Sequence, residues 1–150
     1  MTALAAERDV SRKGAEQTAM VPVISVKLKT GVTVYKGALV CIDTADGYGI
    51  PGTISTTLIP VGIALATVVT GVAASGTYSV DCRRGLFPFV NLGADPVAQA
   101  DVGKTVFVTD DQTISKTSAT ATKSNAGVFW GFDENSQALV EVGIRSATGV

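Results

Sequence analysis

Short runs of alternating apolar and polar residues fill most of the chain after Val21. Ile24, Val26 and Leu28 share one parity, the other parity becomes polar, and the run ends at a turn around Gly31. Such alternation is typical of a half-buried β-strand, because successive side chains of a strand point to opposite faces. The expected strands are 21–28, 32–42, 61–69, 77–83, 86–90, 104–109, 125–132 and 138–144. Short strands between turns predict an all-β fold, a small β-barrel or β-sandwich of short antiparallel strands.

Two stretches of the chain, residues 34–49 and 101–115, repeat one pattern of glycines and apolar residues. In each stretch a glycine, Gly37 or Gly103, precedes an apolar strand that ends at a turn containing aspartate. An isolated glycine in a strand pattern often marks a bulge or bend, and this is what we expect of Gly37.

The similarity of the two halves extends to a second pair of glycines, because Gly62 and Gly127 follow at nearly the same spacing. The pattern predicts a single β domain at 21–150, with two degenerate repeats at about 32–90 and 101–145. The alternative is that an all-β chain repeats glycine and strand patterns by chance.

The first twenty residues differ from the rest, because charged residues are dense there and bulky apolar residues are scarce. A segment that can bury so little is usually mobile unless a neighbour holds it. Two interpretations stay open: a disordered tail, or an extended N-terminal arm at 1–20 that lies across another subunit. The contact residues of such an arm would be Leu4, Arg8, Val10, Arg12 and Lys13.

Composition and charge narrow the range of functions. The chain of 150 residues has 46% hydrophobic and 17% charged residues, a net charge of −1 and no histidine. Histidine is the commonest general base and metal ligand, and no nucleophile or phosphate-loop motif replaces it, so we expect neither an enzyme nor a cofactor or metal. Lys and Arg form no dense cluster in the sequence, so we do not expect nucleic acid as a partner. With no secretion signal and no apolar run of about 18 residues, we expect a protein made in the cytoplasm that binds no membrane.

The two cysteines, Cys41 and Cys82, each lie in a strand-like run with an apolar residue two positions away, Leu39 and Val80 respectively. Residues two apart share one face of a strand. We therefore expect both thiols to be buried and free, since burial is the usual state of a free cysteine.

A pair of arginines followed by two phenylalanines is the strongest candidate for a protein contact in the body of the domain. Phe87 and Phe89 share one face of a short strand that begins just after Arg83 and Arg84. Pro88 lies between the aromatics and has no N–H to donate, which favours an edge strand. Aromatic residues beside arginine are typical of interface centres, so these four residues are predicted to contact a partner protein or a sister subunit. The alternative for the arginines is a solvated turn.

The expected strand at 125–132 is apolar on both faces. Val128, Trp130 and Phe132 share one face, and Phe129 takes the other. One face would pack on the domain core and the other on a second subunit, or both would lie within a single core.

With these patterns, the chain resembles the small capsid cement, or head decoration, proteins of tailed bacteriophages. The resemblance covers most of the chain after Val21 and is carried by glycines and apolar residues, without a unique chemical signature. It lies in Val-Tyr-Lys-Gly-Ala-Leu-Val-Cys-Ile at 34–42, Pro-Val-Gly-Ile-Ala at 60–64, Asp-Val-Gly-Lys-Thr-Val-Phe-Val at 101–108 before a stretch of Thr, Ser and Ala, and Ala-Gly-Val at 126–128.

The resemblance implies a structural virion protein that decorates and stabilises the outside of a phage capsid. Its partners would be the major capsid protein and further copies of itself, a trimer being favoured and a dimer the other possibility. Bridging several shell subunits multiplies modest affinities, because loosening one contact requires that others break as well. The charged N-terminal segment would fit the arm with which such proteins overlap neighbouring subunits, although glycine-rich members often begin directly at the first strand.

A second hypothesis belongs to a different class, a carbohydrate or host-surface binding module on a virion. Such a module needs an exposed aromatic platform, for which Tyr48 and Trp130 are the candidates. Deletion of residues 1–20 separates the two hypotheses, because it would abolish attachment to a capsid but leave glycan binding unchanged.

Overall fold

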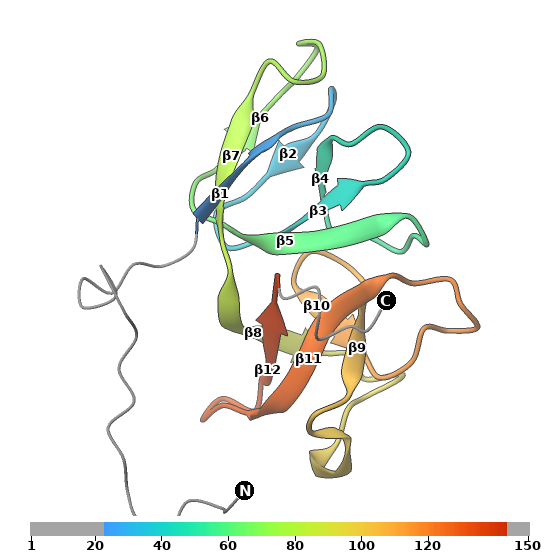
Figure 1. Cartoon of the computed structure of the whole chain (residues 1–150). Helices are drawn as coiled ribbons and strands as arrows, with labels where there is room; N and C mark the ends of the chain where they lie inside the picture. The colour runs from blue at the N-terminus through green and yellow to red at the C-terminus, as the bar shows by residue number, and fades with distance from the viewer. Residues whose placement is uncertain (1–22, 144–150) are drawn as a thin grey trace, which may run out of the picture.

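The computed structural model describes residues 23–143, and strands arranged in two stacked units dominate this part of the chain (Figure 1). The predicted all-β class is confirmed. The elements are β1 (Val23–Lys27), β2 (Thr33–Val34), β3 (Leu39–Asp43), β4 (Gly49–Pro51), β5 (Leu58–Ala64), β6 (Val68–Val69), β7 (Ser79–Arg83), β8 (Gly85–Asn91), the 3-10 turn η2 (Gln99–Asp101), β9 (Thr105–Val108), β10 (Thr113–Ser115), β11 (Asn125–Phe132) and β12 (Ala138–Val142).

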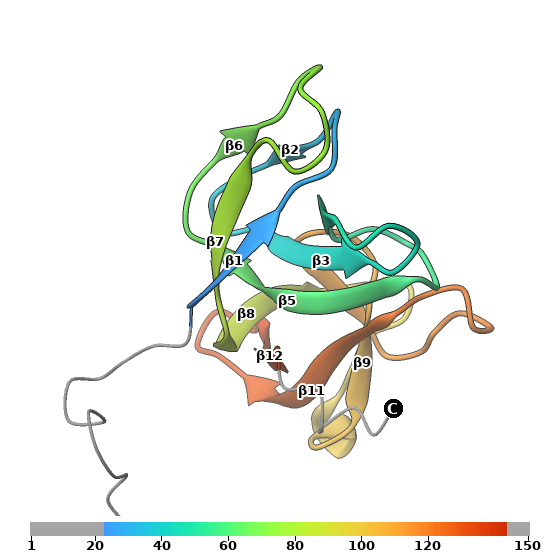
Figure 2. The same cartoon turned by 45° about the horizontal axis from the view of Figure 1, so that its top comes forward.

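The first unit is a curved five-stranded sheet in the order β1-β7-β5-β3-β4, which we call the N-terminal sheet (Figure 2). Its two outer strands approach each other at one end. Leu28 and Gly49 form a parallel bridge there, and the N–H of Lys29 donates to the carbonyl of Gly49 at 3.0 Å. The small sheet of β2 and β6 lies beside it.

The second unit is a closed barrel in the order β10-β8-β12-β11-β9, which we call the C-terminal barrel. Neighbouring strands are antiparallel except β10 and β8, whose parallel pairing closes the barrel through Thr113 with Val90 and Ile114 with Asn91. Of the two architectures predicted, the barrel is therefore the one observed for this half.

The two units share one strand order. In spatial order around each unit, the strands correspond one to one: β1-β7-β5-β3-β4 matches β8-β12-β11-β9-β10. In both units the first and last strands of this order meet in parallel. The bounds of these units differ from those of the predicted repeats, about 32–90 and 101–145. The first unit begins earlier, with β1. The second unit begins with β8, most of which falls in the first predicted repeat. Origin by duplication stays a prediction.

The correspondence holds at the level of single hydrogen bonds. The N–H of Gly37 donates to the carbonyl of Ala64 at 2.9 Å, and the N–H of Gly103 donates to the carbonyl of Phe129 at 2.7 Å. The register between β3 and β5 shifts beside Gly62, and that between β9 and β11 shifts beside Gly127. The repeated glycines of the sequence thus occupy equivalent places in the two units.

Three local predictions were wrong. The strand expected at 32–42 is broken into β2 and β3, and Gly37, with φ +91°, forms a turn between them, so that of the two expectations for this glycine the bend is observed and the bulge is not. The strand expected at 61–69 is divided between β5 and β6. The strand expected at 77–83 begins only at Ser79, so that Tyr78 precedes β7 and is 46% exposed.

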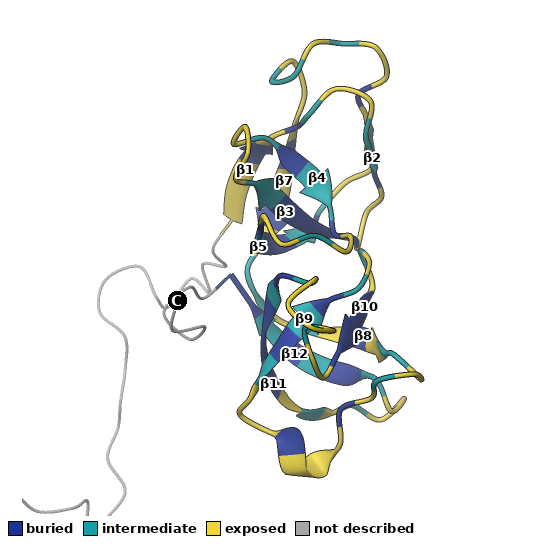
Figure 3. Cartoon of the chain, turned by 90° about the vertical axis from the view of Figure 1, so that its right-hand side faces the viewer, coloured by how far each residue is buried: buried dark blue, intermediate teal, exposed yellow. Residues whose placement is uncertain are grey.

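Two hydrophobic clusters fill the molecule, and β3 belongs to both. Leu39 and Cys41 pack with the core of the C-terminal barrel, whereas Val40 between them faces the core of the N-terminal sheet. Figure 3 shows buried residues running through both units. The prediction for the thiols is confirmed, because Cys41 and Cys82 are free and buried.

Candidate interaction surface

The outer face of β8 is apolar and exposed. Side chains alternate along this strand, so that Phe89 lies in the barrel core and Phe87 packs against that core from a half-buried position. Leu86, Pro88 and Val90 point the other way and are all exposed, Leu86 to 51%. Exposed apolar residues in a row on a closed barrel contribute nothing to its core.

The neighbouring strands extend this apolar face. The register of β12 on β8 sets the half-buried Leu139 opposite Pro88 and Glu141 opposite Leu86. On β11, Trp130 is 51% exposed, and its indole N–H donates to the Glu141 carboxylate at 3.2 Å. We call the set of these apolar residues the β8–β12 strip: Leu86, Pro88, Val90, Leu139 and Trp130.

The N-terminal sheet provides an internal comparison for the strip. Its strands β1 and β7 correspond to β8 and β12, and the register equates Val23 with Leu86, Ser25 with Pro88 and Lys27 with Val90. On β7 the residues that correspond to Leu139 and Glu141 are Asp81 and Arg83. The same architecture therefore folds with a mostly polar outer face, so the fold itself does not require the apolar residues of the strip.

The structure removes Phe89 from the predicted contact residues. Its side chain is only 2% exposed and lies in the core of the C-terminal barrel, and Phe87 faces the same core. Nor is β8 an outer strand, since it lies between β10 and β12. Pro88 is nevertheless tolerated, because β10 pairs only with Val90 and Asn91 and leaves one side of β8 without a partner at the proline.

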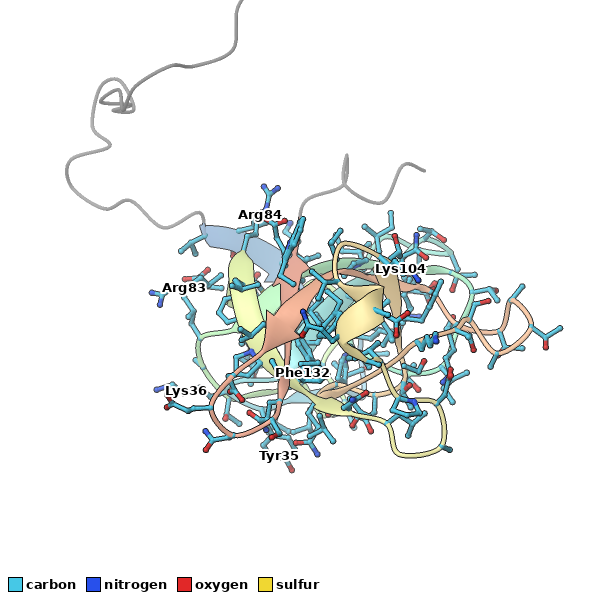
Figure 4. All side chains as sticks on the ribbon, turned by 90° about the horizontal axis from the view of Figure 1, so that it is seen from below. Tyr35, Lys36, Arg83, Arg84, Lys104 and Phe132 are labelled. Carbon is cyan, nitrogen blue, oxygen red and sulfur yellow. The ribbon has the colours of Figure 1, made fainter. Side chains whose placement is uncertain are left out.

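The two arginines have different environments. Arg83 is exposed at the end of β7, whereas the half-buried Arg84 donates from its guanidinium to the carbonyl of Gly143. Figure 4 shows the two side chains leaving the ribbon in different directions. Arg83 is thus available for a partner, while Arg84 holds the junction of the two units to the end of β12. Leu4, Arg8, Val10, Arg12 and Lys13 lie outside the described residues.

The strand at 125–132 follows the predicted faces only in part. A register shift between Phe129 and Gly131 interrupts the alternation, so that Phe132 contacts Phe129 edge-on with ring centroids 5.1 Å apart. Trp130, at the shift, remains exposed, while Val128 is buried.

Ion pairs elsewhere on the molecule hold turns in place. Lys29 bridges Asp43 and Asp46 at 3.1 and 2.9 Å. Asp101, whose side chain is almost completely buried, accepts from the N–H of Ala98 at 2.8 Å and from the ammonium of Lys104 at 3.2 Å. The N–H of Ala98 is the main reason that the pKa of Asp101 lies below its ordinary value.

Within residues 23–143 no group of three or more His, Cys, Asp or Glu side chains is placed to hold a metal ion. In the same residues, no helix has the length and apolar character needed to cross a bilayer.

Comparison with known proteins gives no assignment. No family model, curated protein or solved structure matches this chain. The interpretation of the strip therefore depends on its own chemistry.

The aromatic pair selected from the sequence lies on the inward face of β8. Residues 86–90 are apolar at both parities, and the aromatic pair was chosen because aromatics are common at interfaces. A signal did exist in the correspondence between the halves, since Pro88 and Val90 occupy positions where the first half has Ser25 and Lys27.

Proposed function

We propose that the chain is a structural virion protein that decorates the outside of a tailed-phage capsid and stabilises it by bridging major capsid protein subunits. The observation that carries the proposal is the β8–β12 strip, an apolar surface at positions where the corresponding strands of the same chain are mostly polar. Contiguous exposed apolar surface on a soluble domain is a common mark of a protein–protein contact.

The architecture supports a role in assembly. The two stacked units are joined by β3, whose residues belong to both hydrophobic clusters, rather than by a free linker. A homo-oligomer of such units presents several shell contacts at once, and the segment at 1–20 is the proposed contributor to them, while the exposed Arg83 is a proposed contact between copies. The resemblance to cement proteins favours a trimer, with a dimer as the other possibility.

Sedimentation with heads of the cognate major capsid protein tests the proposal. The full chain is mixed with empty heads, and the fraction that pellets is compared with that of a chain lacking residues 1–20. We expect the full chain to saturate the heads and the shortened chain to remain in the supernatant, although circular dichroism shows that it is folded. A full chain that never pellets would contradict the proposal.

One observation favours a second candidate function, recognition of carbohydrate on a host surface. The indole of Trp130 is half exposed beside the Glu141 carboxylate, an arrangement that can stack on a sugar ring and accept a hydroxyl hydrogen bond. Tyr48 is less suited, because its half-buried ring lies against Gly76. A glycan array with the native chain and with Trp130→Ala tests this candidate, which predicts a signal that the substitution abolishes.

A further inference from the structure

We propose that the β8–β12 strip binds the same strip of a second copy of this chain, and that a two-fold axis relates the two copies. The proposal rests on the proposed function and deepens it, because it names the partner of the same surface and selects the dimer over the trimer that the resemblance favours. Three features of the strip identify a second copy as its partner: its apolar composition, its direction and the charges at its two ends.

The composition of the strip favours a copy of itself over a charged partner. All five of its members are apolar, and the Glu141 carboxylate beside them already accepts from the indole of Trp130. Depletion of charge at the centre is a feature of homodimer interfaces, which are more apolar than transient ones. An apolar strip is also complementary to itself, whereas a charged strip would repel its copy.

The strip has a direction, and its ends carry opposite charge. Strand β8 pairs with β12 from Gly85 to Phe89, a length of about 13 Å at about 3.3 Å per residue. Arg83 is exposed next to the start of β8. Glu134 is exposed in the turn that leads into β12, and so lies at the opposite end.

A two-fold axis through the middle of the strip brings unlike charges together. An axis that lies between the two strips and at right angles to β8 reverses the direction of the second copy, so that Arg83 of each copy faces Glu134 of the other, and the contact uses one patch twice. Opposing the strips in the same direction would set Arg83 against Arg83 and Glu134 against Glu134, which is unfavourable. The charge pattern therefore selects the antiparallel arrangement around an apolar centre near Pro88 and Leu139.

The first test measures the mass of the full chain in solution by light scattering over a range of concentrations. We expect the mass of two chains, and we expect Leu86→Lys to raise the dissociation constant at least about tenfold, as loss of an interface anchor does. The matched control is Val69→Lys, which adds the same charge at an exposed valine of β6, in the small sheet beside the N-terminal sheet, and should leave the mass unchanged. A native mass of one or three chains would overturn the proposal, as would equal effects of the two substitutions.

A charge exchange tests the two-fold arrangement without touching the strip. Arg83→Glu and Glu134→Arg should each weaken the dimer several-fold, because each sets like charges opposite one another. The double variant restores both pairs and should return the dissociation constant close to that of the native chain. If the two effects add instead of cancelling, the two residues do not meet and the arrangement is wrong.

Head binding is measured separately, so that the two proposals can fail independently. A dimer that does not sediment with heads leaves the present inference intact and contradicts the proposed function. A monomer that sediments with heads does the reverse. Leu86→Lys adds a third result: its circular dichroism spectrum should match that of the native chain, because the side chain that it replaces already faces solvent.

Discussion

Gly62 and Gly127 occupy the same place in the two halves of the molecule. Each lies beside the register shift of its strand, and each packs against a backbone carbonyl of the next strand, that of Arg83 for Gly62 and that of Glu141 for Gly127. Neither site has room for a Cβ atom. The close approach of backbone to backbone explains why glycine recurs at nearly the same spacing in both halves.

Substitution of either glycine by alanine should destabilise the fold. The added methyl group would displace a backbone carbonyl rather than a flexible side chain, at a cost of about 1–3 kcal/mol or more. At Gly127 the φ of +156° adds strain. Urea unfolding followed by circular dichroism measures the change. Gly93→Ala is the matched control, because nothing lies within 4 Å of its added Cβ, and equal stability of all three variants would refute the packing argument.

The correspondence between the halves was only partly predictable from the sequence. Alternation located most strands, and the paired glycines at 37 and 103 indicated the repeat, because these signals are local. Closure of the C-terminal barrel depends on the parallel pairing of β10 with β8, for which no local pattern exists. The sequence therefore left barrel and sandwich open.

The sequence located the apolar segment of the candidate surface, but it did not decide which face of that segment points outward. Residues 86–90 are apolar throughout, so their pattern cannot tell which side faces inward. The barrel places the larger side chain of Phe89 inside, against Phe129 and the rest of the core, and leaves Leu86 and Val90 outside. That choice depends on the strands that surround β8, which are distant in sequence.

Phe129 should be the most sensitive of the aromatic residues on β11. Its ring is completely buried in the barrel core, whereas the ring of Phe132, which it contacts, is 37% exposed. Phe129→Ala should cost about 3–5 kcal/mol, a large part of the stability of a small domain, and Phe132→Ala clearly less. Urea midpoints of both variants check this order. A larger loss for Phe132→Ala would show that the core is assigned wrongly.

The two thiols should be inert in the folded protein. Burial raises the pKa of Cys41 and Cys82 to about 12 each, so almost no reactive thiolate forms at pH 8. We expect a thiol reagent to label neither cysteine in native buffer and both in strong urea, with a native labelling rate limited by unfolding. Labelling of either cysteine as fast as a free thiol would contradict their burial.

Stability should depend on Asp101 at acid pH. Because the N–H of Ala98 and the ammonium of Lys104 favour its charged form, the pKa of Asp101 is lower in the folded chain than in the unfolded chain. Its contribution is therefore present above the unfolded pKa of about 3.9 and is lost as the pH falls through the folded pKa. Asp101→Asn should lower stability at pH 6 and lose less on acidification to pH 3. An unchanged pH profile would exclude this role.

The central claim, that the chain stabilises an assembled shell, is tested most directly by calorimetry of empty heads with and without the full chain. Anything that binds the assembled state in preference to its dissociated subunits raises the temperature of disassembly. We predict a rise that increases with the amount of chain added and stops once the heads are saturated. An unchanged disassembly temperature at saturating concentrations of the chain would contradict the claim.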